Sequence, residues 1–453
     1  MTAVHRVARL VAALAVGGAG LLVGARPAAA TSDPYWAQQW NVRKIQADAA
    51  WSVTRGAGIR IGVVDTGIDI GHEEFGGGKV VASVSCVDSG GTPAGCHGNA
   101  QDDNGHGTHV AGTAAARADN GRGIAGVAPD AGLVVVKALR SDGSGTDTDV
   151  GAGILWAAQQ GATVINLSLA DTTSLLGQVL GSSSPIDAAI RQVWASGVVV
   201  VVAAGNASSC GVGGPSQNYG TLPAVVVTST GPEDELACYS LPLGSAQWGV
   251  AAPGGDGTAP ARQIVSTYWF PGRANSYGNA EGTSMAAPHV AGVAALLESQ
   301  GLRGINVVNR ILSTTDAVSC GAGCHGRVNA ARAVGSGPPA PTPAPAGSTP
   351  APTHPTASSV PTASAAAVVP PPSDTTEAPT ITGPLAPATS LPAPAPEQAL
   401  PAVRPRTPFV ADRRRPYSAA GLALVLVLGM AVAIAVTTAR LRRDGRLGRP
   451  GGV

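Results

Sequence analysis

Short apolar runs, each continuous rather than alternating with polar residues, recur between residues 60 and 228. They are rich in Val and Ile and cover Arg60–Val64, Gly132–Lys137, Val164–Leu169, Val198–Ala203 and Ala224–Thr228. Longer segments of helical character accompany them: His106–Ala116, Asp149–Gln160, Pro185–Ser196 and Ser284–Gln300. A strand that is apolar throughout is covered on both faces, as in a parallel sheet. The alternation therefore predicts an α/β fold, a doubly wound and mostly parallel sheet with helices on both faces.

Two polar residues stand just after predicted strands. Asp65 directly follows Arg60–Val64, and Asn206 comes shortly after Val198–Ala203. In open parallel sheets, functional groups gather outside the carboxyl ends of the strands. We therefore expect both side chains at that edge, although a Gly-Asn pair is also typical of a simple turn.

Three motifs supply an acid, a base and a nucleophile in that order. Val63-Val64-Asp65-Thr66-Gly67 carries a carboxylate, residues 104–112 carry His106, and residues 282–292 place Ser284 at the start of an apolar helix. A serine hydroxyl attacks only when a base takes its proton. Imidazole titrates near neutral pH and returns that proton to the leaving group, and a carboxylate fixes its tautomer. The pattern indicates nucleophilic acyl transfer.

Together with Val202–Asn206 and Gly126–Pro129, these motifs resemble the subtilisin-like serine peptidases over roughly residues 51–334. The chain order Asp, His, Ser is that of subtilisin. The resemblance implies that Asp65 orients His106, that His106 activates Ser284, and that Asn206 stabilises the oxyanion together with the Ser284 N–H.

Substrate binding follows from the same resemblance. Leu167, Ser168 and Leu169 would pair with an extended peptide as an added strand. Ala203, Ala204 and Gly205 would line the pocket for the side chain before the cut bond. Ala170 stands where many relatives carry glycine, so the detailed shape of that pocket is open.

Other polar residues receive structural interpretations. His109 follows His106 by three positions, but no glutamate completes a zinc-protease spacing, so we expect it to be structural. His72 and His289 are interpreted as packing or surface residues, and Asp69 as a local hydrogen-bonding group. The oxygen-rich stretch Asp102-Asp103-Asn104 suggests either calcium or a solvated loop, and we favour the loop. No metal or cofactor is predicted.

The first thirty residues predict a secretory signal peptide. His5, Arg6 and Arg9 form a basic start, residues 10–23 are apolar, and Ala28-Ala29-Ala30 offers a cleavage site before Thr31. A transmembrane helix is the alternative, but the apolar run is too short. Residues 31–50 then form a short extension whose Trp36 and Trp40 we expect to pack on the peptidase domain, residues 51–335.

A second set of segments follows that domain. Residues 336–415 are rich in Pro, Ala, Ser and Thr and predict a disordered linker. Residues 416–439 carry no charge and are long enough to span a bilayer as one helix. Arginines are abundant in the tail, residues 440–453, which favours a cytoplasmic C-terminus. We therefore expect a single-pass cell-membrane protein with an extracytoplasmic peptidase domain.

Six cysteines in an exported chain suit three disulfides. Fifteen pairings are possible, and we favour sequence neighbours: Cys86–Cys96, Cys210–Cys238 and Cys320–Cys324. No pair has a zinc-site spacing. The net charge of +1 offers no basic face for nucleic acid.

The short extension is too small for a separately folded inhibitory propeptide. This short extension, the cysteines, the Pro-rich linker and the C-terminal anchor together make the chain resemble the mycosins. The mycosins are membrane-anchored proteases of actinobacterial type VII secretion systems. The resemblance implies protein or peptide substrates and contacts with the membrane and with secretion components. Two alternatives remain open: a structural stabiliser of that membrane complex with secondary proteolysis, and a general degradative envelope protease.

Overall fold

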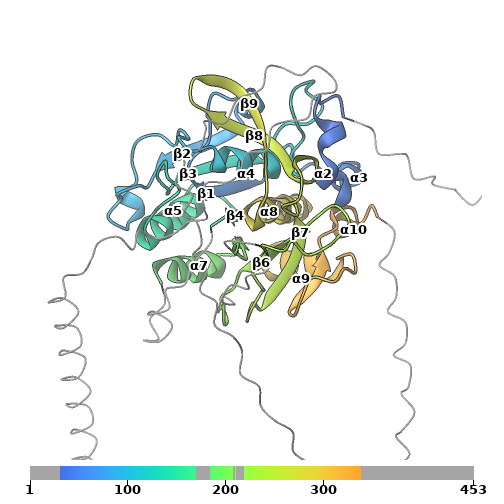
Figure 1. The fold of residues 1–453 in the computed structure, drawn as a ribbon. Coiled ribbons are helices and arrows are strands. Elements are labelled where there is room, and N and C mark those ends of the chain that lie inside the picture. The colour runs from blue at the N-terminus through green and yellow to red at the C-terminus, as the bar shows by residue number, and fades with distance from the viewer. Residues whose placement is uncertain (1–30, 170–183, 208–209, 211–218, 338–453) are drawn as a thin grey trace, which may run out of the picture.

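A computed structural model of the chain describes residues 31–169, 184–207, 210 and 219–337 (Figure 1). The predicted signal peptide, membrane span and tail, nearly all of the linker, and Ala170 lie outside the described residues. Within the described part of the chain, no helix is long and apolar enough to cross a membrane.

The centre of the molecule is an eight-stranded sheet in which every pair of neighbours runs parallel. The strand order is β10-β7-β6-β5-β4-β1-β3-β2. The strands are β1 Arg60–Asp65, β2 Val80–Ser85, β3 Gly132–Lys137, β4 Val164–Leu167, β5 Val199–Ala203, β6 Val225–Thr230, β7 Trp248–Pro253 and β10 Cys324–Arg327. The predicted parallel α/β architecture is confirmed.

Helices and one hairpin complete the domain. The longer helices are α4 His106–Ala115, α5 Asp147–Gln159, α7 Pro185–Ala195, α8 Thr283–Ser299 and α9 Ile305–Ser313. The short α-helices are α2 Trp40–Lys44, α3 Ala47–Ala50 and α10 Ala330–Val334, and the 3-10 helices are η1 Trp36–Gln38, η2 Glu73–Phe75, η3 Pro93–Gly95 and η4 Pro260–Arg262. Strands β8 Ile264–Phe270 and β9 Arg273–Ala280 form an antiparallel hairpin beside α4. The hydroxyls of Thr146 and Ser184 cap α5 and α7, which explains where these helices begin.

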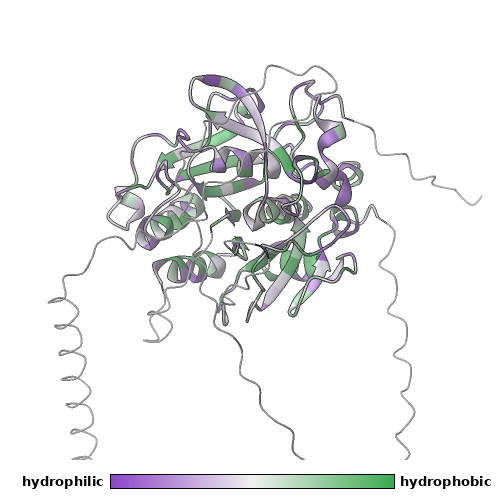
Figure 2. Cartoon of the chain, viewed as in Figure 1, coloured by the Kyte–Doolittle hydropathy of each residue, from purple (hydrophilic) through white to green (hydrophobic). Residues whose placement is uncertain are grey.

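Alternate residues of the central strands belong to two separate apolar clusters. Val63 packs in the cluster that holds α4 and α8, whereas its neighbour Val64 packs in the cluster that holds α5 and α7. Val135 and Val136 divide in the same way. Side chains along a strand point to opposite faces in turn, so continuous apolar runs serve two helical layers. Figure 2 shows hydrophobic residues along these elements and hydrophilic ones at the tip of the β8–β9 hairpin.

Several elements carry little sequence signal and were not predicted. Strand β2 is half-exposed at the edge of the sheet, and β10 reads Cys-His-Gly-Arg, with no large apolar residue. Both exist because a neighbouring strand supplies hydrogen-bond partners. The predicted strand Val164–Leu169 ends earlier, at Leu167, which is the last residue of β4 paired with β5.

Three disulfides join sequence neighbours: Cys86–Cys96, Cys210–Cys238 and Cys320–Cys324. Cys210 is the one described residue between 207 and 219, and its disulfide joins it to Cys238 in the segment between β6 and β7. Such disulfides stabilise the fold because they reduce the conformational entropy of the unfolded chain.

The N-terminal extension lies against the peptidase domain. Trp36 is buried in the larger apolar cluster. Trp40 donates its indole N–H to the carbonyl of Gln263 at 3.0 Å. Lys44 forms an ion pair with Asp234. Residues 31–50 therefore form a fixed arm within the described structure.

Candidate active site

Asp65 and His106 meet at the carboxyl edge of the sheet. Asp65 ends β1 and is fully buried, and His106 begins α4. Nδ1 of His106 lies 2.7 Å from Oδ1 of Asp65, which also accepts the N–H of Thr66 at 2.7 Å. A carboxylate only accepts, so the proton of the neutral ring is on Nδ1. Nε2 is then the basic nitrogen.

Two glycines allow this approach. Gly105 has φ 105°, and a Cβ there would meet the ring of Tyr268 at 2.4 Å. A Cβ on Gly107 would lie 2.1 Å from the carbonyl of Gly67. Only glycine fits such contacts, and Gly105 also needs the positive φ. Gly107 therefore allows α4 to approach Asp65 and the turn after β1, whereas Gly105 allows it to approach β8.

Asp102 organises the loop before α4 and does not fit a calcium site. Its buried carboxylate accepts hydrogen bonds from the Thr66 hydroxyl, from the N–H groups of Asn104 and Gly105, and from both the N–H and the hydroxyl of Thr108. These donors occupy the oxygens that a cation would need. The described residues also contain no group of three or more His, Cys, Asp or Glu suited to a metal.

Ser284 stands in the first turn of α8, after Gly282. Its hydroxyl donates to the carbonyl of Ser168 at 3.0 Å. Among the described residues, no hydrogen bond joins this hydroxyl to His106. The structure thus brings Asp65 and His106 together, and it places the serine proton on a main-chain acceptor from the end of β4.

Asn206 is held through its side-chain oxygen. Oδ1 accepts the N–H of Thr283 at 3.0 Å and the Thr283 hydroxyl at 3.1 Å. The Thr283 hydroxyl in turn accepts the N–H of Gly205 at 3.0 Å. A Cβ on Gly282 would lie 3.2 Å from Nδ2 of Asn206. The amide is therefore fixed with its N–H₂ toward the chain segment that leads into Ser284.

The predicted substrate-binding segments are neighbours at the same edge. β4 and β5 pair in register, with Leu167 opposite Val202, so residues 167–169 and 203–205 leave the sheet side by side. Leu169 and Ala204 belong to one apolar cluster. Tyr219, which sequence reasoning missed, packs in that cluster and donates its hydroxyl to the carbonyl of Ala204 at 3.3 Å. No motif in the sequence marks this tyrosine.

The electrostatics of His106 favour its charged form. Burial lowers the pKa of the ring, but the negative charge of Asp65, its hydrogen bond and a smaller contribution from Asp102 together outweigh burial and raise the pKa above the usual value. An imidazolium that forms beside Asp65 is thereby stabilised.

The other histidines near the site are buried and structural. His109 binds the carbonyl of Ile264, and burial lowers its pKa to about 3. His72 bonds to the carbonyl of Ser276 and accepts the N–H of Glu74. Asp69 accepts a hydrogen bond from the side chain of Gln101. These contacts agree with local roles.

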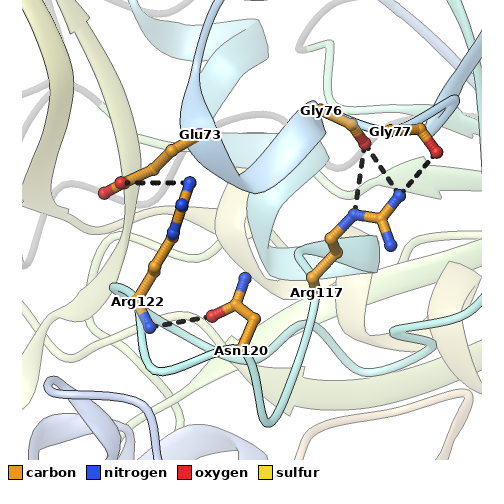
Figure 3. A pocket seen from close by; sticks show the side chains of 6 residues that line it. All are labelled: Glu73, Gly76, Gly77, Arg117, Asn120 and Arg122. Carbon is orange, nitrogen blue, oxygen red and sulfur yellow. Dashed lines mark hydrogen bonds and ion pairs between the residues drawn. The ribbon is translucent and has the colours of Figure 1, made fainter.

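A hollow of about 410 Å³ is lined by Arg117, Asn120 and Arg122, which follow the C-terminal end of α4, and by Glu73, Gly76 and Gly77 (Figure 3). Arg117 donates to the carbonyls of Gly76 and Gly77, and Arg122 pairs with Glu73 at 3.7 Å. Because α4 is about 15 Å long, this hollow is separate from His106, which begins the helix. Its lining charges already bind partners within the chain.

Comparison with known proteins agrees with this geometry. Residues 56–323 match the model of the subtilase family. Thermitase from Thermoactinomyces vulgaris is 42% identical over 309 residues, which cover 67% of this chain and 98% of that protein. The thermophilic serine proteinase of Bacillus sp. (strain AK1) is 40% identical over 307 residues, covering 66% of this chain and 68% of that protein.

Among solved structures, a protease from Pseudoalteromonas arctica PAMC 21717 superposes with a TM-score of 0.58 at 31% identity, covering 68% of this chain and 99% of that one. The fold and the relatives define a serine-type endopeptidase. The chain belongs to the subtilase family.

Proposed function

We propose that Asp65, His106 and Ser284 are the catalytic triad of this endopeptidase. The observation that carries the proposal is the 2.7 Å contact between His106 Nδ1 and Asp65, which leaves Nε2 as the base. Ser284 rotates its hydroxyl from Ser168 to this nitrogen, loses its proton and attacks the scissile carbonyl. His106 then gives the proton to the leaving amine, and water resolves the acyl-enzyme.

Asn206 and the backbone N–H of Ser284 hold the oxyanion in this scheme. The Thr283 contacts support it, because they fix Oδ1 and leave the amide hydrogens of Asn206 to donate. Residues 167–169 pair with the peptide before the cut bond, and residues 203–205 form the wall of its side-chain pocket.

A serine-directed fluorophosphonate tests the triad. Mass spectrometry should find the label on Ser284 of the wild-type protein, and His106→Ala should abolish it. Asp69→Asn serves as the control, since Asp69 bonds locally to Gln101. Equal labelling of Ser284 in the wild type and in His106→Ala would show that His106 is not the base.

We further propose that residues 416–439 anchor the enzyme in the cell membrane with the peptidase domain outside, as in the mycosins of type VII secretion. The uncharged span, its arginine-rich flanks and the packed extension 31–50 support this proposal. A chain that ends after residue 415 should move from the membrane fraction to the medium. Unchanged membrane association would contradict the anchor.

The role of proteolysis in secretion is tested with Ser284→Ala at the native locus. Loss of substrate cleavage with the same secretion defect as gene deletion supports a processing protease. Normal secretion with Ser284→Ala but not with the deletion would instead favour the structural stabiliser. Broad stabilisation of envelope proteins in Ser284→Ala would favour the degradative protease.

A further inference from the structure

We propose that Ser168 is a positioning residue for the nucleophile, and that its hydroxyl replaces the helical donor which Pro288 removes from the carbonyl of Ser284. The inference rests on the proposed function, in which Ser284 attacks the substrate. It assigns a task to the side chain of Ser168, beyond the strand pairing expected of its backbone.

The first observation is the proline inside α8. In an α-helix each carbonyl accepts the N–H of the residue four positions later. Pro288 stands four residues after Ser284 and has no N–H. The carbonyl of Ser284 therefore loses its helical donor, and a main-chain carbonyl in a buried site requires another one.

Ser168 supplies that donor. Its hydroxyl lies 2.7 Å from the carbonyl of Ser284, and the side-chain amide of Asn166 donates to the same hydroxyl at 2.9 Å. A hydroxyl has one proton, so the proton from Ser168 goes to Ser284 while its oxygen accepts from Asn166. Asn166 and Ser168 are both buried, which makes an unpaired group at this place costly.

The two serines bind each other reciprocally. Ser168 donates to the carbonyl of Ser284, and Ser284 donates its hydroxyl to the carbonyl of Ser168. The first bond fixes the main chain of α8 against the end of β4. The second is given up when Ser284 turns to His106. Only the first persists through the reaction, so it holds the nucleophile in register with the substrate strand.

Kinetics of Ser168→Ala test the role. Loss of one hydrogen bond that orients the attack should lower kcat about tenfold, with KM changed less than about twofold. Ser168→Cys, a weaker donor of similar shape, should fall between. Ser89→Ala is the matched control: it removes another buried hydroxyl, one that donates to Asp149 away from the site, and it should leave kcat unchanged.

A double-mutant cycle with Pro288→Ala decides the mechanism. The Pro288→Ala substitution restores an N–H four residues after Ser284, so removal of the Ser168 hydroxyl in that background should cost less than about twofold in kcat. The same tenfold loss in both backgrounds would overturn the inference. If Ser168→Ala fails to fold in a thermal unfolding measurement, Ser168→Cys takes its place in the cycle. Absence of fluorophosphonate label on wild-type Ser284 would defeat the proposed function, whereas normal labelling with an additive cycle defeats only this inference.

Discussion

The side-chain amide nitrogen of Asn41 lies 2.7 Å from Nε2 of His289, and this contact ties the N-terminal arm to the helix that carries Ser284. The other ring nitrogen, Nδ1, lies 2.9 Å from the carbonyl of Met285. An amide nitrogen donates and a carbonyl accepts, so the ring is neutral with its proton on Nδ1. Burial lowers the pKa of His289 to about 4, against backbone bonds that raise it.

His289 and His109 should make the fold sensitive to acid. Their pKa values in the folded protein are about 4 and about 3, below the ordinary value of 6.5. Between pH 6.5 and these lower pKa values, each histidine is protonated in the unfolded chain but neutral in the folded chain. The free energy of unfolding therefore falls as the pH drops below 6.5. Each histidine removes about 1.4 kcal/mol of unfolding free energy per pH unit.

The comparison of wild type with His289→Gln isolates this effect from the carboxylates. Urea unfolding from pH 7 to pH 5 should give a shallower decline for the variant, by the contribution of one histidine. Parallel curves for the two proteins would show that His289 does not bind protons on unfolding.

Asn41→Leu should destabilise the protein at pH 7, because it leaves Nε2 of His289 buried without a donor.

The acid limb of activity should report His106. The base acts only when neutral, so kcat/KM should rise with pH through a pKa above 6.5, the direction set by Asp65. Asp65→Asn should move this limb to lower pH and reduce turnover on the order of 10³–10⁴, since the tautomer is no longer fixed. A pH–rate profile of both proteins, with Asp69→Asn as control, checks the prediction. An acid limb at the same pH in Asp65→Asn and in the wild type would show that Asp65 does not raise the pKa of His106.

Asn206→Ala should lower kcat with little change in KM. Removal of this kind of donor in subtilisin costs on the order of 10²–10³ in turnover, and we expect the same range here. Thr283→Val should cost less, about tenfold, because the backbone N–H of Thr283 still holds Oδ1 of Asn206. Thr283→Ser keeps the hydroxyl and should retain near-normal turnover. Steady-state kinetics on one peptide substrate gives kcat and KM for the three variants. Equal losses of kcat in Thr283→Val and Thr283→Ser would show that the Thr283 hydroxyl does not position Asn206.

Tyr219 should restrict the residue before the cut bond to small side chains. It is buried, packs with Leu169 and Ala204, and donates to the Ala204 carbonyl. Tyr219→Ala should raise kcat/KM for a large apolar residue at that position roughly 10- to 100-fold relative to alanine. A library of peptides that differ only at this position provides the measurement. An unchanged preference would place Tyr219 outside the pocket.

Much of the architecture could be predicted from the sequence because it depends on short apolar runs and short motifs. Val63 and Val64, or Val135 and Val136, are apolar without alternation, and this alone predicts strands covered by helices on both faces. Asp65, His106 and Ser284 stand in short motifs where glycines must fit close backbone contacts. The partners in those contacts are distant in the sequence, as Tyr268 is from Gly105, but the motifs themselves are short. The edge on which Asp65 falls follows from the strand pattern, because Asp65 ends β1.

Tertiary structure decided what depends on a distant partner. Strand β10 has no apolar pattern and exists only because β7 pairs with it. The sequence leaves Asp102 as either a cation ligand or a loop residue, and only the fold shows that five donors fill its oxygens. The exchange of hydrogen bonds between Ser168 and Ser284 joins residues 116 positions apart. A hydrogen bond of this kind requires that both groups be buried at one place, and only the packing of α8 against β4 brings them there.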